Sequence, residues 1–365
     1  MMARIAGAGH ALPPAIDQAE LWSGFFRGHY AEADMASRVW QRSGVQTRRG
    51  VVNPVHEDIS SWGTGARMQR FVQEALPLGK EAVSAALEDA GVTAEEVGLF
   101  AVVSCTGYAT PGLDILLARD LGMSDAVHRL AIGHMGCYAA LPGLGAANDF
   151  VVARQKLAVL LCLELTSLHV QPSTETARAG QPTPEDLQQM VTHALFGDAA
   201  AAVVLHPDAG GLELVDLIAR TDASTSEHMT WQVTDLGFRM GLSPAVPEIL
   251  GRHARPVVAE LLDRHGLTIE EVAGWAVHPG GRKIVEVVGE ALDLPEEHLQ
   301  ASYEVLHDVG NCSSATVLLV LERVQQLRDI AAGQHVVLMA FGPGLTLYAA
   351  LLRRREDGSG DAQPP

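Results

Sequence analysis

The segment AVSAALEDAGVTAEEV at residues 82–97 recurs as VVAELLDRHGLTIEEV at residues 257–272. Gly91 of the first copy aligns with Gly266 of the second, 175 positions later, and both copies have a threonine two positions after the glycine. In each copy an amphipathic stretch is followed by this glycine, an acidic turn and an apolar run, which predicts a helix, a capped turn and a buried strand. The chain is therefore predicted to contain an internal duplication.

Two further matches follow in the same order along the chain. Cys137 follows a glycine and precedes a stretch of small residues that predicts a helix, and Asn311 does the same 174 positions later. The FGD segment that begins at Phe196 is followed by an apolar strand, as is the FGPG segment that begins at Phe341. The spacing of this last pair is only 145 positions, because the first half contains a polar loop at about residues 171–189.

Strands that alternate with helices in both halves predict an α/β protein. Two such halves packed about a pseudo-twofold axis form the layered αβαβα architecture of the thiolase type. We predict an N-terminal half at residues 1–208, a C-terminal half at residues 209–353 and a disordered polar tail at residues 354–365. The helices after Cys137 and Asn311 are then equivalent, and their N-termini meet near the axis.

The composition excludes several classes of function. A net charge of −18 argues against a nucleic-acid partner and against a basic, membrane-binding surface. The first residues lack the apolar core of a signal peptide, and no apolar run is long enough to span a membrane. The four cysteines form no CxxC pair, and no cysteine and histidine spacing fits a compact zinc cluster. We expect a cytoplasmic protein with reduced thiols and no bound metal.

Cys137 is the candidate nucleophile. It precedes a predicted helix, and the positive end of a helix dipole stabilises a thiolate and lowers the pKa of the thiol. Such a thiol attacks acyl thioesters. A cysteine among glycine and alanine residues is also compatible with a small buried apolar residue, which is the better interpretation of Cys162 and Cys312.

The duplication brings two more polar residues toward Cys137. His278 follows the strand of the second repeat, where its imidazole can pair with a thiolate and then donate a hydrogen bond to an oxyanion. Asn311 offers a neutral amide donor, although an asparagine after glycine is often only a cap. Together they would form an oxyanion hole for a thioester and for the enolate of a decarboxylated malonyl group. This chemistry requires no metal and no redox cofactor.

Five short motifs surround these residues: GCYA at 136–139, ALFGD at 194–198, HPGG at 278–281, GNCSSA at 310–315 and FGPG at 341–344. With them, the chain resembles the chalcone synthase-like family, the type III polyketide synthases, from about residue 35 to residue 353. The resemblance implies a thiolase-fold homodimer without an acyl carrier domain. It also implies that Cys137 holds the starter and the growing chain, while His278 and Asn311 promote malonyl-CoA decarboxylation and stabilise the condensation oxyanion.

The resemblance also implies roles for residues near these motifs. Phe196 and Phe238 correspond to two gatekeeping phenylalanines between a CoA tunnel and the cavity, although core packing would equally account for them. Arg38 and Arg42 fall where the family places basic CoA contacts, and guanidinium–phosphate pairs give a physical reason for them. The alternative is that the basic stretch at residues 38–49 is a solvated turn.

The remaining expected cavity residues are Cys105, Thr110, His169, Thr192, Met229 and Ser313. His169 stands where plant chalcone synthases have threonine, and Thr192 and Met229 stand where they have glycine, so the cavity should be narrower or reshaped. Thr110 replaces a methionine that reaches into the partner subunit's cavity. Cys105 is typical of several bacterial members, which indicates a bacterial-type enzyme.

We therefore predict a decarboxylating, Claisen-condensing acyltransferase that uses acyl-CoA and malonyl-CoA. A fatty acyl starter would give an alkylpyrone, an alkylresorcinol or a related phenolic product. One alternative is a malonyl-CoA-primed, naphthalene-type synthase. Another is an enzyme similar to ketoacyl-carrier-protein synthase III, which stops after one condensation and uses a carrier protein. The non-enzymatic alternative is a catalytically silent partner that only binds acyl groups.

Overall fold

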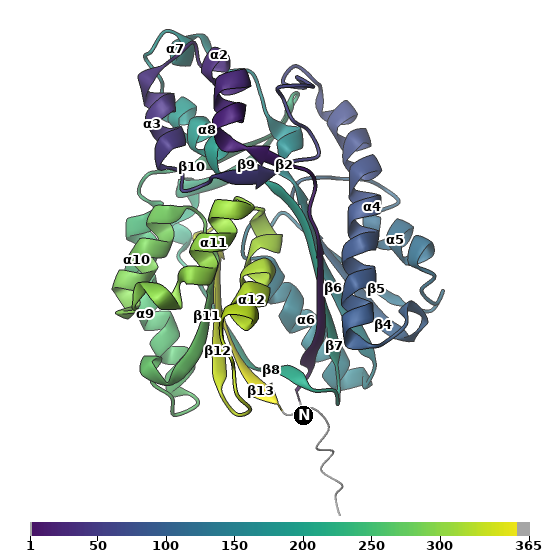
Figure 1. The fold of residues 1–365 in the computed structure, drawn as a ribbon. Coiled ribbons are helices and arrows are strands. Elements are labelled where there is room, and N and C mark those ends of the chain that lie inside the picture. Colours follow the sequence, from purple (N-terminus) through teal and green to yellow (C-terminus); the bar gives the residue numbers. More distant parts are fainter. Residues whose placement is uncertain (1, 356–365) are drawn as a thin grey trace, which may run out of the picture.

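The chain folds into two halves that contribute to one nine-stranded sheet (Figure 1). The computed structural model describes residues 2–355. The strands of the first half are β1 (Arg4–Ala11), β4 (Val97–Ser104), β5 (His128–Gly133), β6 (Leu157–Leu165) and β7 (Asp198–His206). Those of the second half are β8 (Gly211–Thr221), β11 (Val272–Val277), β12 (His335–Gly342) and β13 (Thr346–Arg355). Two short pairs lie outside this sheet: β2 (Ala15–Asp17) with β3 (Thr47–Arg49), and β9 (Met229–Thr234) with β10 (Gly237–Leu242).

The helices also divide between the halves. Those of the first half are α1 (Gln18–Leu21), α2 (Arg27–His29), α3 (Asp34–Arg42), α4 (Thr64–Ala90), α5 (Leu113–Leu121), α6 (Ala140–Arg154), α7 (Glu175–Arg178) and α8 (Pro184–Leu195). Those of the second half are α9 (Val246–Asp263), α10 (Arg282–Leu292), α11 (Gln300–Asp308) and α12 (Thr316–Leu327). No helix in the described part of the chain is both long enough and apolar enough to cross a membrane.

The strand order is the same in both halves. The first half has the order β1-β7-β6-β4-β5, and the second has the order β8-β13-β12-β11. Corresponding neighbours also run in the same relative direction, because β7–β6 and β13–β12 are antiparallel while β6–β4 and β12–β11 are parallel. Within the described residues β5 has no counterpart in the second half. The repeated order confirms two duplicated halves.

The local structure of the repeat is also the same in both copies. Gly91 after α4 and Gly266 after α9 both have a φ of +66°, the left-handed conformation that glycine adopts without strain. Each is followed by a capping box, in which Thr93 or Thr268 exchanges hydrogen bonds with a glutamate three positions later. The predicted helix, turn and strand are present at both sites.

The helices complete the five predicted layers (Figure 1). α6 and α12 lie between the two halves and share a core with the inner faces of their strands. α4 and α5 pack on the outer face of the first half, and α9 and α10 pack on the outer face of the second. A smaller group of elements, from α1 to α3 with α7 and α8, has its own core and lies above the sheet in Figure 1.

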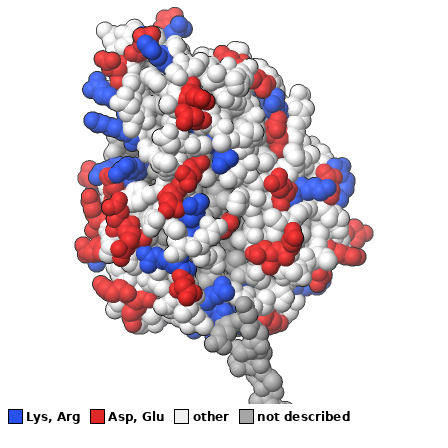
Figure 2. Space-filling model, viewed as in Figure 1, with Lys and Arg blue, Asp and Glu red and all other residues white. Residues whose placement is uncertain are grey.

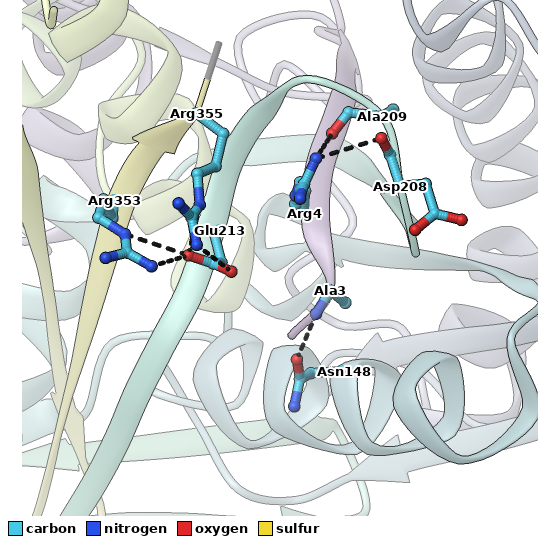
Figure 3. A network of polar contacts seen from close by, with 8 residues as sticks. All are labelled: Ala3, Arg4, Asn148, Asp208, Ala209, Glu213, Arg353 and Arg355. Atoms are coloured by element: carbon cyan, nitrogen blue, oxygen red, sulfur yellow. Dashed lines mark hydrogen bonds and ion pairs between the residues drawn. The ribbon is translucent and has the colours of Figure 1, made fainter. Parts of the chain in front are cut away.

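The halves meet where β1 pairs with β8 through only two residue pairs. Figure 3 shows polar contacts at this seam, where Arg353 and Arg355 of β13 both donate to the buried carboxylate of Glu213 in β8. The backbone N–H of Ala3 donates to Oδ1 of Asn148 in α6, which fixes the start of β1 against the central layer. These contacts add directional hydrogen bonds to the short β1–β8 pairing.

The predicted tail starts two positions too early. Arg354 and Arg355 pair with Leu212 and Gly211 of β8, so they belong to the last strand. Both residues belong to β13 because β8 supplies backbone partners for them. The rest of the predicted tail, residues 356–365, lies outside the described residues.

Candidate active site

Cys137 lies in the tight turn between β5 and α6. Gly136 has a φ of +81°, and a Cβ atom at this position would be 2.5 Å from Cδ of Pro343. Only glycine fits there, and the chain can therefore turn sharply and place Cys137 three residues before α6 begins. The thiol is 5% exposed. Gly136 and the start of α6 thus position a buried thiol, as the motif predicted.

The prediction that this thiol has a lowered pKa is wrong. Burial raises the pKa of Cys137 to about 12, and the charge of Glu164 acts in the same direction. The Ser313 hydroxyl group beside the thiol opposes this shift without cancelling it. Desolvation disfavours the thiolate because Cys137 is buried. The resting side chain is a neutral thiol that needs a base.

His278 follows β11 and is completely buried. Its backbone N–H donates to the carbonyl group of Met339 at 2.8 Å, and its ring lies edge-on to Phe341 with 5.5 Å between the centroids. Neither Nδ1 nor Nε2 has a hydrogen-bond partner among the described residues. Burial lowers the pKa of His278 to about 3, so the imidazole is neutral. Buried polar atoms rarely lack partners, which marks this ring as a group that awaits a ligand.

Asn311 presents the donor end of its amide group. Its backbone forms a bridge with Phe196, donating to the carbonyl group of Leu195 and accepting from the N–H of Gly197. Its side-chain Oδ1 accepts a hydrogen bond of 2.9 Å from the N–H of Ser313. This contact fixes the orientation of the amide, so its NH₂ group is the end left to bind an oxygen atom.

The three predicted catalytic residues belong to one buried region. Cys137, Phe196 and Ser313 line a closed cavity of about 30 Å³, which we call the thiol chamber. Asn311 adjoins it through its contacts with Phe196 and Ser313. Cys137 and Phe341 are members of one buried cluster, and Phe341 packs on the ring of His278. The convergence predicted from the duplication is therefore consistent with the contacts around each residue.

Cys105 lies in the thiol chamber, as predicted. The N–H of Gly136 donates to its sulfur atom at 3.1 Å, and the indole of Trp231 donates to its carbonyl group at 2.9 Å. Cys105 therefore connects the turn that holds Cys137 with β9 on the opposite wall. Trp231 and Met240 also line this chamber, and sequence reasoning did not single them out.

A second closed cavity of about 50 Å³ adjoins the first, and we call it the inner chamber. The two chambers share the lining residues Thr166, Phe196, Trp231 and Met240. The predicted cavity residues Phe238, His169 and Thr192 line the inner chamber. The predicted cavity residues therefore lie around two adjacent small spaces, with Phe196 lining both and Phe238 lining the inner chamber.

His169 forms a rigid wall of the inner chamber. Its Nε2 donates to the carbonyl group of Thr106 at 2.7 Å, and its Nδ1 accepts from the N–H of Phe238 at 3.0 Å. Its ring also stacks on that of Phe238, with 4.7 Å between the centroids. With both nitrogen atoms occupied, His169 is held in the chamber wall and packs against Phe238, the second predicted gatekeeper.

The two remaining predicted residues, Met229 and Thr110, line neither chamber. Met229 is buried in the core of the second half, whereas the next two residues of β9, Thr230 and Trp231, line the thiol chamber. Met229 shares its strand face with Trp231 and belongs to the same buried cluster as Cys137 and Phe196, so its place beside the cavity stays a prediction. Thr110 is exposed in the loop after β4, and its hydroxyl group contacts that of Tyr108 at 3.3 Å.

A wide groove of about 540 Å³ opens at the surface above these chambers. It is lined by both predicted CoA residues, Arg38 and Arg42, and by Arg282 and Lys283, which the sequence did not single out. At its inner end lie Leu195 and Gly280, the neighbours of Phe196 and His278 in the sequence. Figure 2 shows basic side chains along the left edge of the molecule, on a face where acidic and basic side chains are interspersed.

Arg48, in the same basic stretch, has a different role. It is buried, and its guanidinium donates to Gln18 and to the carbonyl groups of His193 and Phe196. Burial lowers its pKa to about 9. Arg48 therefore fixes the backbone of gatekeeper Phe196 from behind, and it cannot reach a CoA phosphate at the surface.

Glu164 is a functional residue that sequence reasoning missed. This carboxyl group at the end of β6 is completely buried, and burial raises its pKa. It accepts hydrogen bonds from the N–H of Cys105, from the hydroxyl group of Thr106 and from that of Ser314. It thereby joins the Cys105 loop to the loop that holds Asn311. A glutamate within an otherwise apolar strand was the available signal.

The comparisons with known proteins agree with this fold. Two family models match, "Chalcone and stilbene synthases, N-terminal domain" at residues 2–209 and "Chalcone and stilbene synthases, C-terminal domain" at residues 217–355. The 1,3,6,8-tetrahydroxynaphthalene synthase of Streptomyces peucetius subsp. caesius is 34% identical over 96% of this chain and 92% of its own. The alpha-pyrone synthesis polyketide synthase-like Pks18 of Mycobacterium tuberculosis is 32% identical over 86% of this chain and 81% of its own.

A solved structure gives the same result for the fold. The 1,3,6,8-tetrahydroxynaphthalene synthase from Streptomyces coelicolor A3(2), a bacterial type III polyketide synthase, superposes with a TM-score of 0.89 and 25% identity, over 98% of this chain and all of that one. The fold and the buried thiol site define a condensing enzyme of the thiolase-like class. The chain belongs to the chalcone and stilbene synthase family, as a type III polyketide synthase of the bacterial type and hence an acyltransferase.

Proposed function

We propose that this enzyme carries its acyl chain on Cys137 and builds a polyketide from malonyl-CoA at the His278–Asn311 pair. The observation that supports this most strongly is the imidazole of His278, buried with two unpartnered nitrogen atoms next to the cluster that contains a buried thiol. A buried neutral base and a buried neutral thiol are suited to exchange a proton when a thioester arrives.

The loading step follows from these protonation states. Cys137 transfers its proton to His278, and Sγ attacks the carbonyl carbon of an acyl-CoA. The bond from that carbon to the CoA sulfur breaks, the bond to Sγ forms, and the imidazolium returns the proton to the departing thiolate. In the intermediate, the amide NH₂ of Asn311 and the N–H of His278 donate to the oxyanion.

The same two donors serve the extension step. When malonyl-CoA loses CO₂, the electron pair of the broken C–C bond moves onto the thioester and generates an enolate. Two donors at the enolate oxygen stabilise this charge in a dry cavity, where hydrogen bonds are strongest. The enolate carbon then attacks the acyl carbonyl carbon on Cys137, the bond from that carbon to Sγ breaks, and the chain, now two carbon atoms longer, leaves as a β-ketoacyl-CoA. The released Cys137 thiolate attacks this thioester and displaces CoA, which returns the chain to Cys137 for the next extension.

CoA is expected to bind in the surface groove, with its phosphates on Arg38 and Arg42. Replacing both with Gln should raise the KM for malonyl-CoA by about 10-fold or more with little change in kcat, because each charge-assisted hydrogen bond contributes about 1.5–3 kcal/mol when desolvated and less at a surface. Steady-state kinetics measure this effect. Arg119→Gln, an exposed arginine on the outer layer, is the control. Unchanged KM in the double variant would contradict this assignment.

We infer that the starter is a short acyl group. The chambers measure about 30 and 50 Å³, and their walls include His169, Trp231 and Phe238, which pack against one another. A long fatty acyl chain would require these aromatic side chains to move. Small size therefore favours the malonyl-primed, naphthalene-type alternative over the alkylpyrone and alkylresorcinol products. The named activity of the Streptomyces relatives supports the same choice.

We also propose a homodimer that pairs through the edge of the sheet. β5 is the last strand of the sheet, and each of its six residues is exposed or half-buried, including Leu130 and Ile132. An edge strand of this kind pairs readily with a second copy. The exposed loop that contains Thr110 follows β4, the neighbour of β5. In this dimer the loop would lie near the partner subunit. Light scattering should give twice the 38.8 kDa mass of one chain, and a monomer would contradict the proposal.

The proposed function is tested by supplying malonyl-CoA alone and with acetyl-, hexanoyl- or dodecanoyl-CoA, and by identifying products by mass spectrometry. We expect masses that correspond to a short starter plus several malonyl-derived two-carbon units. Dodecanoyl-CoA should give little extended product. A single-condensation product that forms only on a carrier protein would instead support the synthase III alternative.

A further inference from the structure

The inner chamber is unusually basic for this protein. Its lining includes the side chains of Arg48, Arg49 and Arg239 and the imidazoles of His169 and His193, and no aspartate or glutamate is among its lining residues. The chain as a whole has 44 acidic and 26 basic residues. The lining of the inner chamber therefore has the opposite charge to the chain as a whole.

None of the three guanidinium groups has an anionic hydrogen-bond partner among the described residues. Arg48 is bound to Gln18 and to backbone carbonyl groups, so its donors are occupied. Arg49 has a buried Nε without an acceptor, and neither Arg49 nor Arg239 forms an ion pair with any described residue. Partly buried charges are normally paired, because removing a cation from water without a partner costs several kcal/mol.

One buried carboxyl group, that of Asp198, lies near enough to act on Arg48, but its oxygen atoms are occupied by other donors. The Asp198 carboxyl group accepts hydrogen bonds from the N–H groups of Val51 and Ser167 and from the hydroxyl groups of Thr166 and Ser167. It does not line the chamber. Burial raises the pKa of Asp198, and its four hydrogen bonds oppose that shift. The positive potential of the inner chamber is therefore available to a ligand.

The uncharged groups of the chamber also suit an anion. The hydroxyl group of Tyr30 contacts Nδ1 of His193 at 2.7 Å, and burial, followed by the charges of neighbouring cationic groups including Arg239, lowers the pKa of His193 well below its usual range. His193 is thus a neutral hydrogen-bonding group in a positive field. The chamber volume of about 50 Å³ exceeds the space of a single water molecule and is adequate for a small planar group.

We propose that the inner chamber binds the free carboxylate of a short dicarboxylic acyl starter attached to Cys137, with Arg49 and Arg239 as its cationic partners. The inference rests on the proposed function, because the acyl chain reaches the inner chamber from Cys137 past the shared wall of Thr166 and Phe196. Ion pairing stabilises the carboxylate in its ground state and so slows its loss as CO₂. A starter held there keeps its carboxylate, whereas an extender that binds at the His278–Asn311 pair loses CO₂.

The test compares pairs of thioesters that have the same chain length and branching but differ in charge. Succinyl-CoA and 4-methylpentanoyl-CoA have the same branching, with a carboxylate in one and an isopropyl group in the other. Malonyl-CoA and isovaleryl-CoA form a second pair. The rate of acyl transfer to Cys137 is followed by mass spectrometry of the intact protein. We expect the wild-type enzyme to load each carboxylate starter about 10-fold or more faster than its neutral isostere.

Variants separate charge recognition from folding. Arg239→Gln and Arg49→Gln should each slow loading of the carboxylate starters by roughly 10-fold, while loading of the neutral isosteres stays within about twofold. Arg239→Lys should restore part of the preference because it keeps the charge without the planar fork. Loading of the neutral starter also confirms that each variant is folded.

The possible failures can be distinguished. Equal loading of charged and neutral starters by the wild type, or an unchanged preference in both glutamine variants, would overturn the carboxylate site and leave the role of Cys137 intact. Failure of every starter to load on Cys137 would overturn the proposed function, and the carboxylate site with it.

Discussion

Replacing Cys137 with Ala should abolish acyl loading and polyketide formation, with a loss of at least about 10³-fold in turnover. Cys137 lines the thiol chamber, and its turn depends on Gly136, a position that admits no Cβ atom. Slow loss of CO₂ from malonyl-CoA should persist, because the donors of His278 and Asn311 remain. Intact-protein mass spectrometry and product analysis measure the two effects.

The matched control is Cys162→Ala. Cys162 is also a buried free cysteine, but it lies in β6 within the core between the two halves. It should retain acyl loading and product formation. Retained polyketide formation in the Cys137 variant, or loss of loading in the Cys162 variant, would contradict the assignment of the nucleophile.

The second large effect is expected at the oxyanion donors. Asn311→Asp keeps the acceptor for the N–H of Ser313, so the loop retains its main anchor, but it replaces the amide donor with an oxygen atom. Malonyl-CoA decarboxylation should fall by about 10²–10³-fold, equivalent to about 2.7–4 kcal/mol of transition-state stabilisation. Release of CO₂ in the absence of a starter measures this step directly.

His278→Gln should impair both steps. A glutamine side chain can still donate to an oxyanion but cannot accept the proton of Cys137, so alkylation of Cys137 by iodoacetamide should slow along with decarboxylation. His265→Gln, a histidine of the repeat turn that pairs with Asp216 at the surface, is the control. Normal alkylation and decarboxylation in His278→Gln would show that the buried imidazole acts on neither group.

Much of the fold could be predicted from the repeat. Gly91 and Gly266 determine the same turn in both halves because a left-handed residue after a helix favours glycine, and this signal is local in sequence. The duplication then placed Asn311 opposite Cys137 without any knowledge of their contacts. The packing of β9 was not accessible in the same way, so Trp231, two residues beyond Met229 on the same strand face, was not singled out.

Properties that depend on packing could not be predicted from the sequence. The pKa of Cys137 was expected to be low because a helix dipole is visible in the sequence, whereas the degree of burial that reverses the shift is not. Arg48 and Arg49 are adjacent in the chain and chemically identical. Only the structure shows that one is occupied by backbone carbonyl groups and the other faces the inner chamber.

The central claim is that Cys137 carries a growing chain built from malonyl-CoA. The most direct measurement is mass spectrometry of the Cys137 peptide after the enzyme is mixed with malonyl-CoA and quenched within the first turnovers. We predict a series of adducts on Cys137 that differ by successive two-carbon ketide units, together with a released product of several such units. Adducts confined to another residue, or product formation with Cys137 unmodified throughout, would contradict the account.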